Sequence, residues 1–215
     1  EDWEAVRRAQ GYLVIQTNDA RNSRSGAGSH AEDPEARRES MRQRRDDLAS
    51  AIERAEGERP SVIDSKKLIG GGDDEMNFAR VLSNNEFRRE EVGLVAGATY
   101  YGDEWVEARA AYCGESIDIV HEPGEKAYCE NEVGSDLLEY MTRTPVEQSV
   151  TRFGRDADVM SRVYVDTDAV PDHFPVIDIS DRVVRLTSTQ TSAHAAVADG
   201  AGTLAEIAEA SDVTR

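Results

Sequence analysis

The residues best suited to chemistry lie in the segment 144–155, TPVEQSVTRFGR. Gln148, Arg152 and Arg155 are spaced 0, 4 and 7, so on a helix one amide and two guanidinium groups share a stripe. Guanidinium donors match phosphate oxygens in pairs and stabilise the charge that develops during phosphoryl transfer. This spacing therefore predicts a site that binds a polyphosphate.

The same segment contains the signals of a helix start. Thr144 and Glu147 form a capping box and Pro145 lies in the first turn, which predicts a helix that begins at Thr144. At about 200° from the polar stripe lie three apolar residues that we expect to be buried: Val146, Val150 and Phe153. Gly154, near the helix end, lets the backbone turn away or a ligand approach closely.

A structural role for the two arginines is the alternative. Cations near the carboxyl end of a helix complement its dipole, and this chain supplies 43 acidic residues as possible partners. The two interpretations differ in what surrounds the stripe. A stripe that faces an open cleft at the carboxyl edge of the sheet favours phosphate binding, whereas a stripe held in ion pairs favours the structural role.

The segment from Gln148 to Arg155 resembles motif VI of superfamily 2 helicases, whose pattern is Gln-x-x-Gly-Arg-x-Gly-Arg. The match covers Gln148, Arg152, Gly154 and Arg155, and it fails at Thr151, where the pattern has glycine. The resemblance implies that Gln148 and both arginines reach ATP bound against another lobe, with one arginine acting as an arginine finger. It also implies that ATP and Mg²⁺ are cofactors, held mainly by that first lobe.

An upstream segment is similar to motif V of the same helicases. A small-residue strand at 93–97, GLVAG, leads through Thr99 to Gly102 and Asp103. The resemblance implies that Thr99 contacts the nucleic-acid backbone and that Gly102 and Asp103 contact the nucleotide. An ordinary strand-to-helix turn with Asp103 as the N-cap residue is the alternative.

The segment 60–67, PSVIDSKK, occupies the place of motif IV. Lys66 and Lys67 are two of the chain's three lysines, and we expect them, with Ser65, to contact nucleic-acid phosphates, most simply those of DNA. The sequence contains no Gly-x-x-x-x-Gly-Lys-Ser/Thr loop to hold the β- and γ-phosphates. We therefore expect a first motor lobe in the parent chain, before Glu1, and no ATP hydrolysis by this segment alone.

Strands and helices that alternate along the chain must position these residues. Apolar runs predict strands at 12–16, 61–64, 92–97, 116–120 and 163–165. Helical patterns predict helices at 34–56, 78–82, from 103 onward, at 137–142 and at 145–153. Asp33, Pro34 and Gly57 mark the ends of the first of these helices. The alternation predicts an α/β fold with a mostly parallel sheet covered by helices, and the helicase resemblance implies that this sheet is RecA-like, with helices on both faces.

Three parts are expected along the chain. Residues 1–57 form a strand, a loop and a helix that lead into the lobe, residues 58–190 form the lobe itself, and residues 191–215 begin a helical segment. The stretch 203–215, TLAEIAEASDVTR, resembles the opening of a helix-turn-helix, which implies a winged-helix module. The alternative for this stretch is an amphipathic packing helix. The chain starts without Met and stops inside a helical pattern, so we expect a fragment of a longer protein.

The composition says more about the salt concentration in which the protein works than about the molecules that it binds. The 215 residues carry 43 acidic and 25 basic side chains, a net charge of −18, with arginine in place of lysine almost throughout. This balance resembles proteins of extremely halophilic archaea and their viruses or plasmids, where molar salt screens the self-repulsion. Cys113 and Cys129 predict neither a zinc site nor a disulfide framework, so we expect the cytoplasm. No apolar run approaches the roughly 18 residues of a membrane span.

Two further functions stay open beside the helicase lobe. The first is a non-enzymatic DNA-binding or regulatory protein of a virus or plasmid, with the tail contacting DNA. The second is a nuclease with carboxylate-bound metal, which requires Asp64, Asp73 and Asp74 to converge on one cleft. We expect no metal site, because Asp73 and Asp74 follow three glycines instead of a buried strand.

Overall fold

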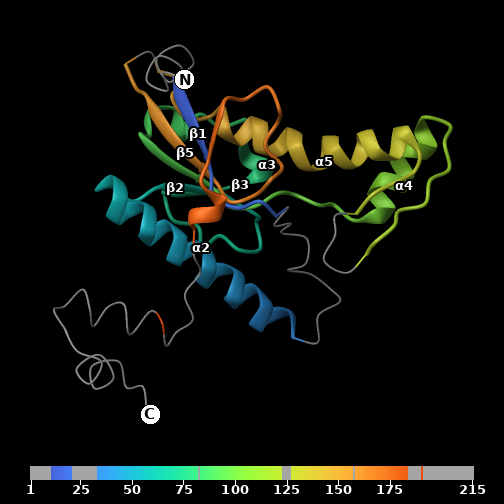
Figure 1. The fold of residues 1–215 in the computed structure, drawn as a ribbon, viewed down its shortest axis with the longest axis horizontal. Coiled ribbons are helices and arrows are strands. Elements are labelled where there is room, and N and C mark those ends of the chain that lie inside the picture. The colour runs from blue at the N-terminus through green and yellow to red at the C-terminus, as the bar shows by residue number, and fades with distance from the viewer. Residues whose placement is uncertain are drawn as a thin grey trace. The chain divides into compact units, whose positions relative to one another are not determined.

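A parallel sheet of six strands forms the centre of the fold, in the order β3-β2-β4-β5-β1-β6 (Figure 1). The computed structural model describes residues 11–20, 33–81, 83–122, 127–156, 158–183 and 190. The strands are β1 (Tyr12–Gln16), β2 (Ser61–Asp64), β3 (Glu75–Asn77), β4 (Val92–Val95), β5 (Ser161–Val165) and β6 (Val176–Asp178). Every pairing between them is parallel. The sheet confirms the predicted α/β class and is consistent with a RecA-like lobe.

Helices cover both faces of this sheet, as predicted. They are α2 (Pro34–Glu56), α3 (Phe78–Val81), η2 (Glu86–Arg89), α4 (Asp103–Tyr112), α5 (Glu132–Val150) and η3 (Ser180–Arg182). The two long helices, α2 and α5, lie on opposite sides of the strands (Figure 1). Among the described residues, no helix is long and apolar enough to cross a membrane.

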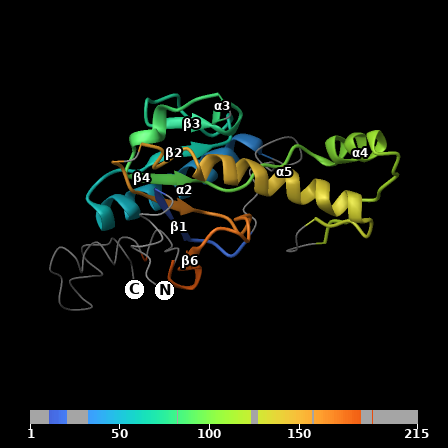
Figure 2. The same cartoon turned by 90° about the horizontal axis from the view of Figure 1, so that it is seen from above.

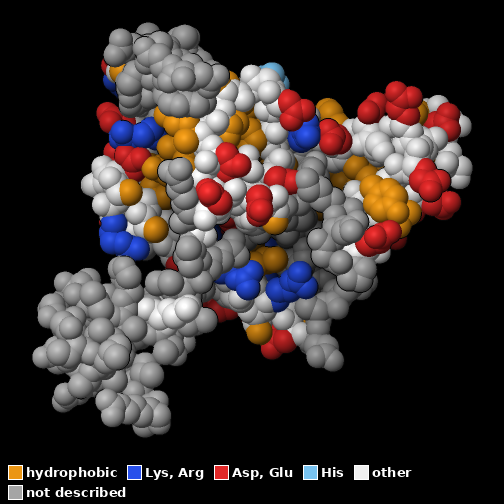
Figure 3. Space-filling view, in the orientation of Figure 1, with side chains coloured by type: hydrophobic (Ala, Val, Ile, Leu, Met, Phe, Trp, Pro, Cys, Tyr) orange, Lys and Arg blue, Asp and Glu red, His pale blue; other side chains and the backbone are white. Residues whose placement is uncertain are grey.

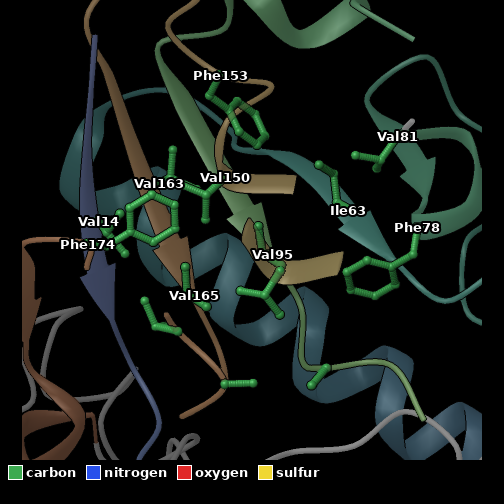
Figure 4. Close-up of a cluster of buried hydrophobic side chains, with 14 of the residues drawn as sticks. Val14, Ile63, Phe78, Val81, Val95, Val150, Phe153, Val163, Val165 and Phe174 are labelled. Carbon is green, nitrogen blue, oxygen red and sulfur yellow. The ribbon is translucent and has the colours of Figure 1, made fainter. Parts of the chain in front are cut away.

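The two faces of the strands bury different side chains, because successive residues of a strand point to opposite sides. Toward α5, Val14, Val163 and Val165 gather with Val146 and Val150 of that helix and with Phe153, which follows it. Figure 4 shows this cluster. Toward α2, residues of alternating position, Leu13, Ile15, Val62, Leu94 and Tyr164, pack against Ala49 and Ile52. The three apolar residues predicted to be buried around the arginine segment, Val146, Val150 and Phe153, are each 0% exposed.

The ends of α2 follow the sequence signals. Asp33 accepts hydrogen bonds from the backbone N–H groups of Glu35 and Ala36, at 3.1 and 3.0 Å. Gly57 ends the helix with a left-handed φ of 79°. These local signals predicted the helix correctly because its ends depend on nearest neighbours.

The first described segment belongs to the same sheet as the lobe expected at 58–190. β1 lies between β5 and β6, and α2 packs on the strands next to it. The chain divides after Asp181, and the second unit, Arg182–Arg215, lies almost wholly outside the described residues. The helix-turn-helix-like tail falls in that part.

The predicted strand at 116–120 is wrong. Val120 forms one antiparallel bridge with Tyr128 and the segment does not join the sheet. Ile117 is buried instead in a separate cluster of α4 and α5, with Val106 and Leu138. The apolar run therefore covers α4 and the first part of α5, which lie away from the strands in both ribbon views (Figures 1 and 2).

The two helices predicted at 137–142 and 145–153 form one continuous helix, α5, and Thr144 does not start a new one. The helix begins after Asn131, whose side chain accepts a hydrogen bond from the Gly134 backbone N–H at 3.1 Å. Pro145 lies inside it and has no N–H to donate to the carbonyl of Met141. The Thr99 hydroxyl donates to that carbonyl at 2.5 Å instead. A tertiary contact thus satisfies the group that the proline leaves without a helical donor.

Candidate functional site

The two arginines of the predicted stripe follow the end of α5. The helix ends at Val150, and backbone bonds from Arg152 to Ser149 and from Phe153 to Val150, at 3.1 and 3.2 Å, tighten the next residues into a turn. The prediction that the helix continues through residue 153 is therefore wrong. Gln148 lies in the last helical turn, Arg152 is half-buried and Arg155 is exposed. The turn leads into β5, so both arginines lie at the amino edge of the sheet.

The two guanidinium groups converge on one neutral oxygen. Arg152 Nη1 and Arg155 Nη1 donate to Asn85 Oδ1, at 3.3 and 2.9 Å. The Arg155 Nε also donates to the Thr151 carbonyl at 2.6 Å, which fixes the direction of its side chain. Asn85 lies immediately before η2, more than 60 residues earlier in the chain. No spacing in the sequence marks it as a partner, and sequence reasoning missed it.

The close approach of two like charges has an electrostatic cost. Burial lowers the pKa of the Arg152 guanidinium, and the positive charge of Arg155 lowers it further. An arginine nevertheless stays charged in proteins. An anion bound between the two groups would relieve this repulsion, which makes the pair suited to phosphate.

An aromatic stack holds the arginine turn against η2. Phe153 is fully buried and its ring stacks on Phe87, with the ring centroids 5.6 Å apart. Gly93 of β4 makes room for it, since a Cβ at that position would lie 2.6 Å from the Phe153 ring. Because Phe87 belongs to η2, this stack ties the segment that carries Asn85 to the turn that carries the arginines.

A contact between two glycines sets the path of the backbone after the turn. Gly11 and Gly154 have φ values of 81° and 60°, and a Cβ on either would overlap the carbonyl oxygen of the other. Only glycine has both the conformation and the space for this approach. Gly154 therefore serves a backbone contact that directs the chain from the arginines into β5.

Acidic side chains next to the site pair with other arginines. Asp156 lies 3.6 Å from Arg88 and 3.5 Å from Arg89, and Asp158 lies 3.2 Å from Arg89. Within the described part of the chain, no carboxylate forms an ion pair with Arg155. The stripe lies at the amino edge and not at the expected carboxyl edge, and the described partner that both arginines share is a neutral amide. The bond from Arg155 to the carbonyl of Thr151, the C-cap residue of α5, fits the helix-dipole alternative.

The residues similar to motif V lie at the opposite edge of the sheet. Thr99 is 7% exposed and its hydroxyl is bonded to Met141. Gly102 precedes α4 with a φ of 98°, and Asp103 is the first residue of that helix. Asp103 accepts a hydrogen bond from the Tyr100 hydroxyl, and its oxygens lie 3.0 Å from His121 Nε2. Burial and this bond raise the pKa of Tyr100.

The lysine pair shares that opposite edge. Ser65, Lys66 and Lys67 follow β2, the neighbour of β4, and both lysines are exposed. Met141, the partner of Thr99, lies nine positions before Val150 in α5, which corresponds to about 14 Å along the helix at ~1.5 Å per residue. The structure thus places Gln148, Arg152 and Arg155 near one another, and Gly102, Asp103, Thr99 and the lysine segment at the other edge.

The three carboxylates required for a nuclease do not converge in the described chain. Asp64 is fully buried, accepts a hydrogen bond from Ser65 N at 2.6 Å and lies 3.9 Å from the buried Arg45. Asp73 and Asp74 are exposed in the loop before β3. Among the described residues, no three His, Cys, Asp or Glu side chains form a group that could hold a metal ion.

Comparisons of the chain with protein-family models, with curated proteins and with solved structures found no match.

Proposed function

We propose that this chain is the second motor lobe of an ATP-dependent nucleic-acid helicase or translocase. In this proposal Arg152 and Arg155 bind the phosphates of ATP held by a first lobe, and one of them acts as the arginine finger. The observation that carries the proposal is the convergence of both guanidinium groups on Asn85 Oδ1. A neutral acceptor aligns the two guanidinium groups without adding a negative charge between them.

The framework supports the same proposal. The parallel α/β sheet with helices on both faces belongs to the class of folds from which motor lobes are built. Fold alone does not imply function, so the argument rests on the arginine pair. The Phe87–Phe153 stack and the Gly11–Gly154 contact hold that pair in place before a ligand arrives, and preorganised cations contribute most to phosphoryl transfer.

The proposal assigns ATP to one edge of the sheet and nucleic acid to the other. ATP and Mg²⁺ bind mainly to the first lobe and meet the arginines at the amino edge. Nucleic acid, most simply DNA, contacts Ser65, Lys66 and Lys67 at the carboxyl edge. The Thr99 hydroxyl is already bonded within the protein, so we assign it no phosphate contact. The proposed place of action is the cytoplasm, where ATP is present.

The test is ATP hydrolysis by a protein that contains both lobes, in molar potassium chloride, with and without single-stranded DNA. We expect Arg152→Ala and Arg155→Ala each to lower the DNA-stimulated rate by at least about a hundredfold, since an arginine finger contributes roughly 10³–10⁵ to kcat. Arg89→Ala is the matched control, because Arg89 lies at the same edge but pairs with Asp156 and Asp158. A rate that is unchanged in both test variants contradicts the proposal.

A further inference from the structure

Asn85 uses its side chain in an unusual way for its position. It precedes η2, where an asparagine commonly caps the helix through its side-chain oxygen, yet Asn85 makes no such bond. The cap-like contact comes from its neighbour, since Asn84 Oδ1 accepts a hydrogen bond from Glu86 N at 2.8 Å. The Asn85 oxygen is thus available to the arginines, and it accepts from both.

We propose that Asn85 is a third member of the phosphate site, which binds a polyphosphate such as the phosphate chain of a nucleoside triphosphate. Its Oδ1 aligns the two guanidinium groups, and its Nδ2 supplies a further donor to a phosphate oxygen. This inference rests on the proposed function and extends it to the ligand and to a residue outside the helicase-like motif. The structure shows no acceptor for the Asn85 Nδ2 among the described residues.

The neutrality of Asn85 is the decisive property. A carboxylate at this position would form ion pairs with both arginines, and two opposite charges attract each other more strongly than a cation attracts a neutral amide oxygen. It would also cancel much of the charge that attracts phosphate. An amide has nearly the same shape as a carboxylate, and it orients the two cations without neutralising them.

Two contacts hold the backbone of η2, directly after Asn85, next to the turn that carries the arginines. The Arg155 backbone N–H donates to the Arg88 carbonyl at 3.2 Å, and Phe87 stacks on Phe153. Arg88 and Phe87 both lie in η2, directly after Asn85. The segment that carries Asn85 is therefore held against the turn by a backbone bond and an aromatic contact. Neither of these depends on the arginine side chains. A change of the amide alone should leave these contacts intact.

The chain offers a matched control for the charge at this position. Asn84→Asp and Asn85→Asp each add one negative charge at adjacent residues, but Asn84 bonds to the backbone of Glu86 and not to the arginines. A long-range effect of the added charge would appear in both variants. A loss of binding that arises because the new carboxylate pairs with Arg152 and Arg155 would appear only in Asn85→Asp.

The experiment is isothermal titration calorimetry of inorganic tripolyphosphate into the 215-residue chain in molar potassium chloride. We expect Asn85→Asp to weaken binding at least tenfold, Asn85→Ala to weaken it about two- to fivefold, and Asn84→Asp to change it less than twofold. Arg152→Ala and Arg155→Ala, measured alongside, should weaken binding at least tenfold. Circular dichroism of each variant checks that the fold is kept.

The outcomes separate this inference from the proposed function. If the arginine variants lose binding while Asn85→Asp matches Asn84→Asp, the role of Asn85 is overturned and the arginine site stands. If the wild-type chain does not bind tripolyphosphate, or if the arginine variants bind it normally, the phosphate site that includes Asn85 is overturned, and the ATP hydrolysis test on the two-lobe protein decides the arginine-finger proposal separately. As a second readout, the side-chain Nε–H resonances of Arg152 and Arg155 should shift on tripolyphosphate addition in the wild type and not in Asn85→Asp.

Discussion

The two edges of the sheet use helicase-like residues in opposite ways. At the amino edge, the guanidinium groups of Arg152 and Arg155 share one neutral amide oxygen, and the stack of Phe87 on Phe153 holds the turn that carries them. At the carboxyl edge, Thr99 and Asp103 are bonded to other parts of the protein. A motif match is therefore weaker evidence for ligand binding where the matching side chains are already bonded to other parts of the protein, as Thr99 and Asp103 are.

The same two regions differ in charge. From Tyr100 to Thr142, the described residues contain ten carboxylates and one arginine. On the face shown in Figure 3, red carboxylates surround an orange apolar patch on the α4 side of the molecule. The amino edge contains both signs of charge: Arg152 and Arg155 share the oxygen of Asn85, whereas Arg88 and Arg89 pair with Asp156 and Asp158. The excess of carboxylates in the segment 100–142 is one reason why we propose that the phosphates of ATP meet the amino edge and not this segment.

The largest effect that we expect in the amino-edge region is that of Gly154→Ala. The new Cβ would overlap the Gly11 carbonyl at a φ of 60°, so we expect the free energy of unfolding to fall by about 3 kcal/mol or more. Gly57→Ala is the control: it has a φ of 79° but nothing within 4 Å of the new Cβ, and should cost about 1–2 kcal/mol. Urea unfolding in molar salt measures both, and equal costs would show that the glycine contact is unimportant.

Gly93→Ala and Gly134→Ala compare the two regions directly. Each new Cβ is crowded, by the Phe153 ring at 2.6 Å and by the Cys129 side chain at 2.8 Å, so we expect each variant to lose about 1–3 kcal/mol of stability. Only Gly93→Ala should also weaken tripolyphosphate binding, because it displaces the ring that anchors the arginine turn. Similar losses of binding in both variants, measured well below their unfolding transitions, would contradict the separation of the regions.

Thr99→Val removes the hydroxyl that bonds to the Met141 carbonyl. Pro145 supplies no N–H to replace it, so we expect a loss of about 1–3 kcal/mol from the unsatisfied buried carbonyl. In a Pro145→Ala background the helix regains its own donor, and the same change should cost less, by about 1 kcal/mol. Thermal unfolding of the four proteins in this cycle measures the coupling, and strictly additive effects would show that the hydroxyl does not compensate for the proline.

Asp103→Asn should have the smallest effect. The residue lies between Tyr100 and His121 at an exposed position, where such pairs contribute about 0–1 kcal/mol. We expect a small change in stability and unchanged tripolyphosphate binding. A loss of ATP hydrolysis of more than tenfold in the two-lobe protein would instead assign Asp103 to the nucleotide site, as its resemblance to motif V implies.

The sequence predicted the elements whose signals are local. β1, β2, β4 and β5 contain short apolar runs, and α2 has both of its caps in the sequence. β3 and β6 were missed because each has three residues and includes polar ones, EMN and VID. Their strand conformation depends on pairing with β2 and β1 at the sheet edges.

The errors in the helices and in the site came from contacts between distant residues. Thr144-Pro145 is a good helix start by local rules, but the Thr99 hydroxyl compensates the proline and the helix continues. The turn after Val150 depends on Gly11, far earlier in the chain. The sequence pattern likewise could not predict Asn85 as a partner of the arginines, because only the fold brings these distant residues together. The spacing of Gln148, Arg152 and Arg155 located the site but not its partners.

The most direct test of the arginine site is single-turnover ATP hydrolysis by a two-lobe protein saturated with ATP and single-stranded DNA, comparing Arg152→Lys and Arg155→Lys with the wild type. Lysine keeps the charge but loses the planar fork of donors. We predict that at least one variant hydrolyses ATP more than about a hundredfold slower, with ATP affinity changed only a few-fold. Wild-type rates in both variants would contradict the assignment of these arginines to the transferred phosphate.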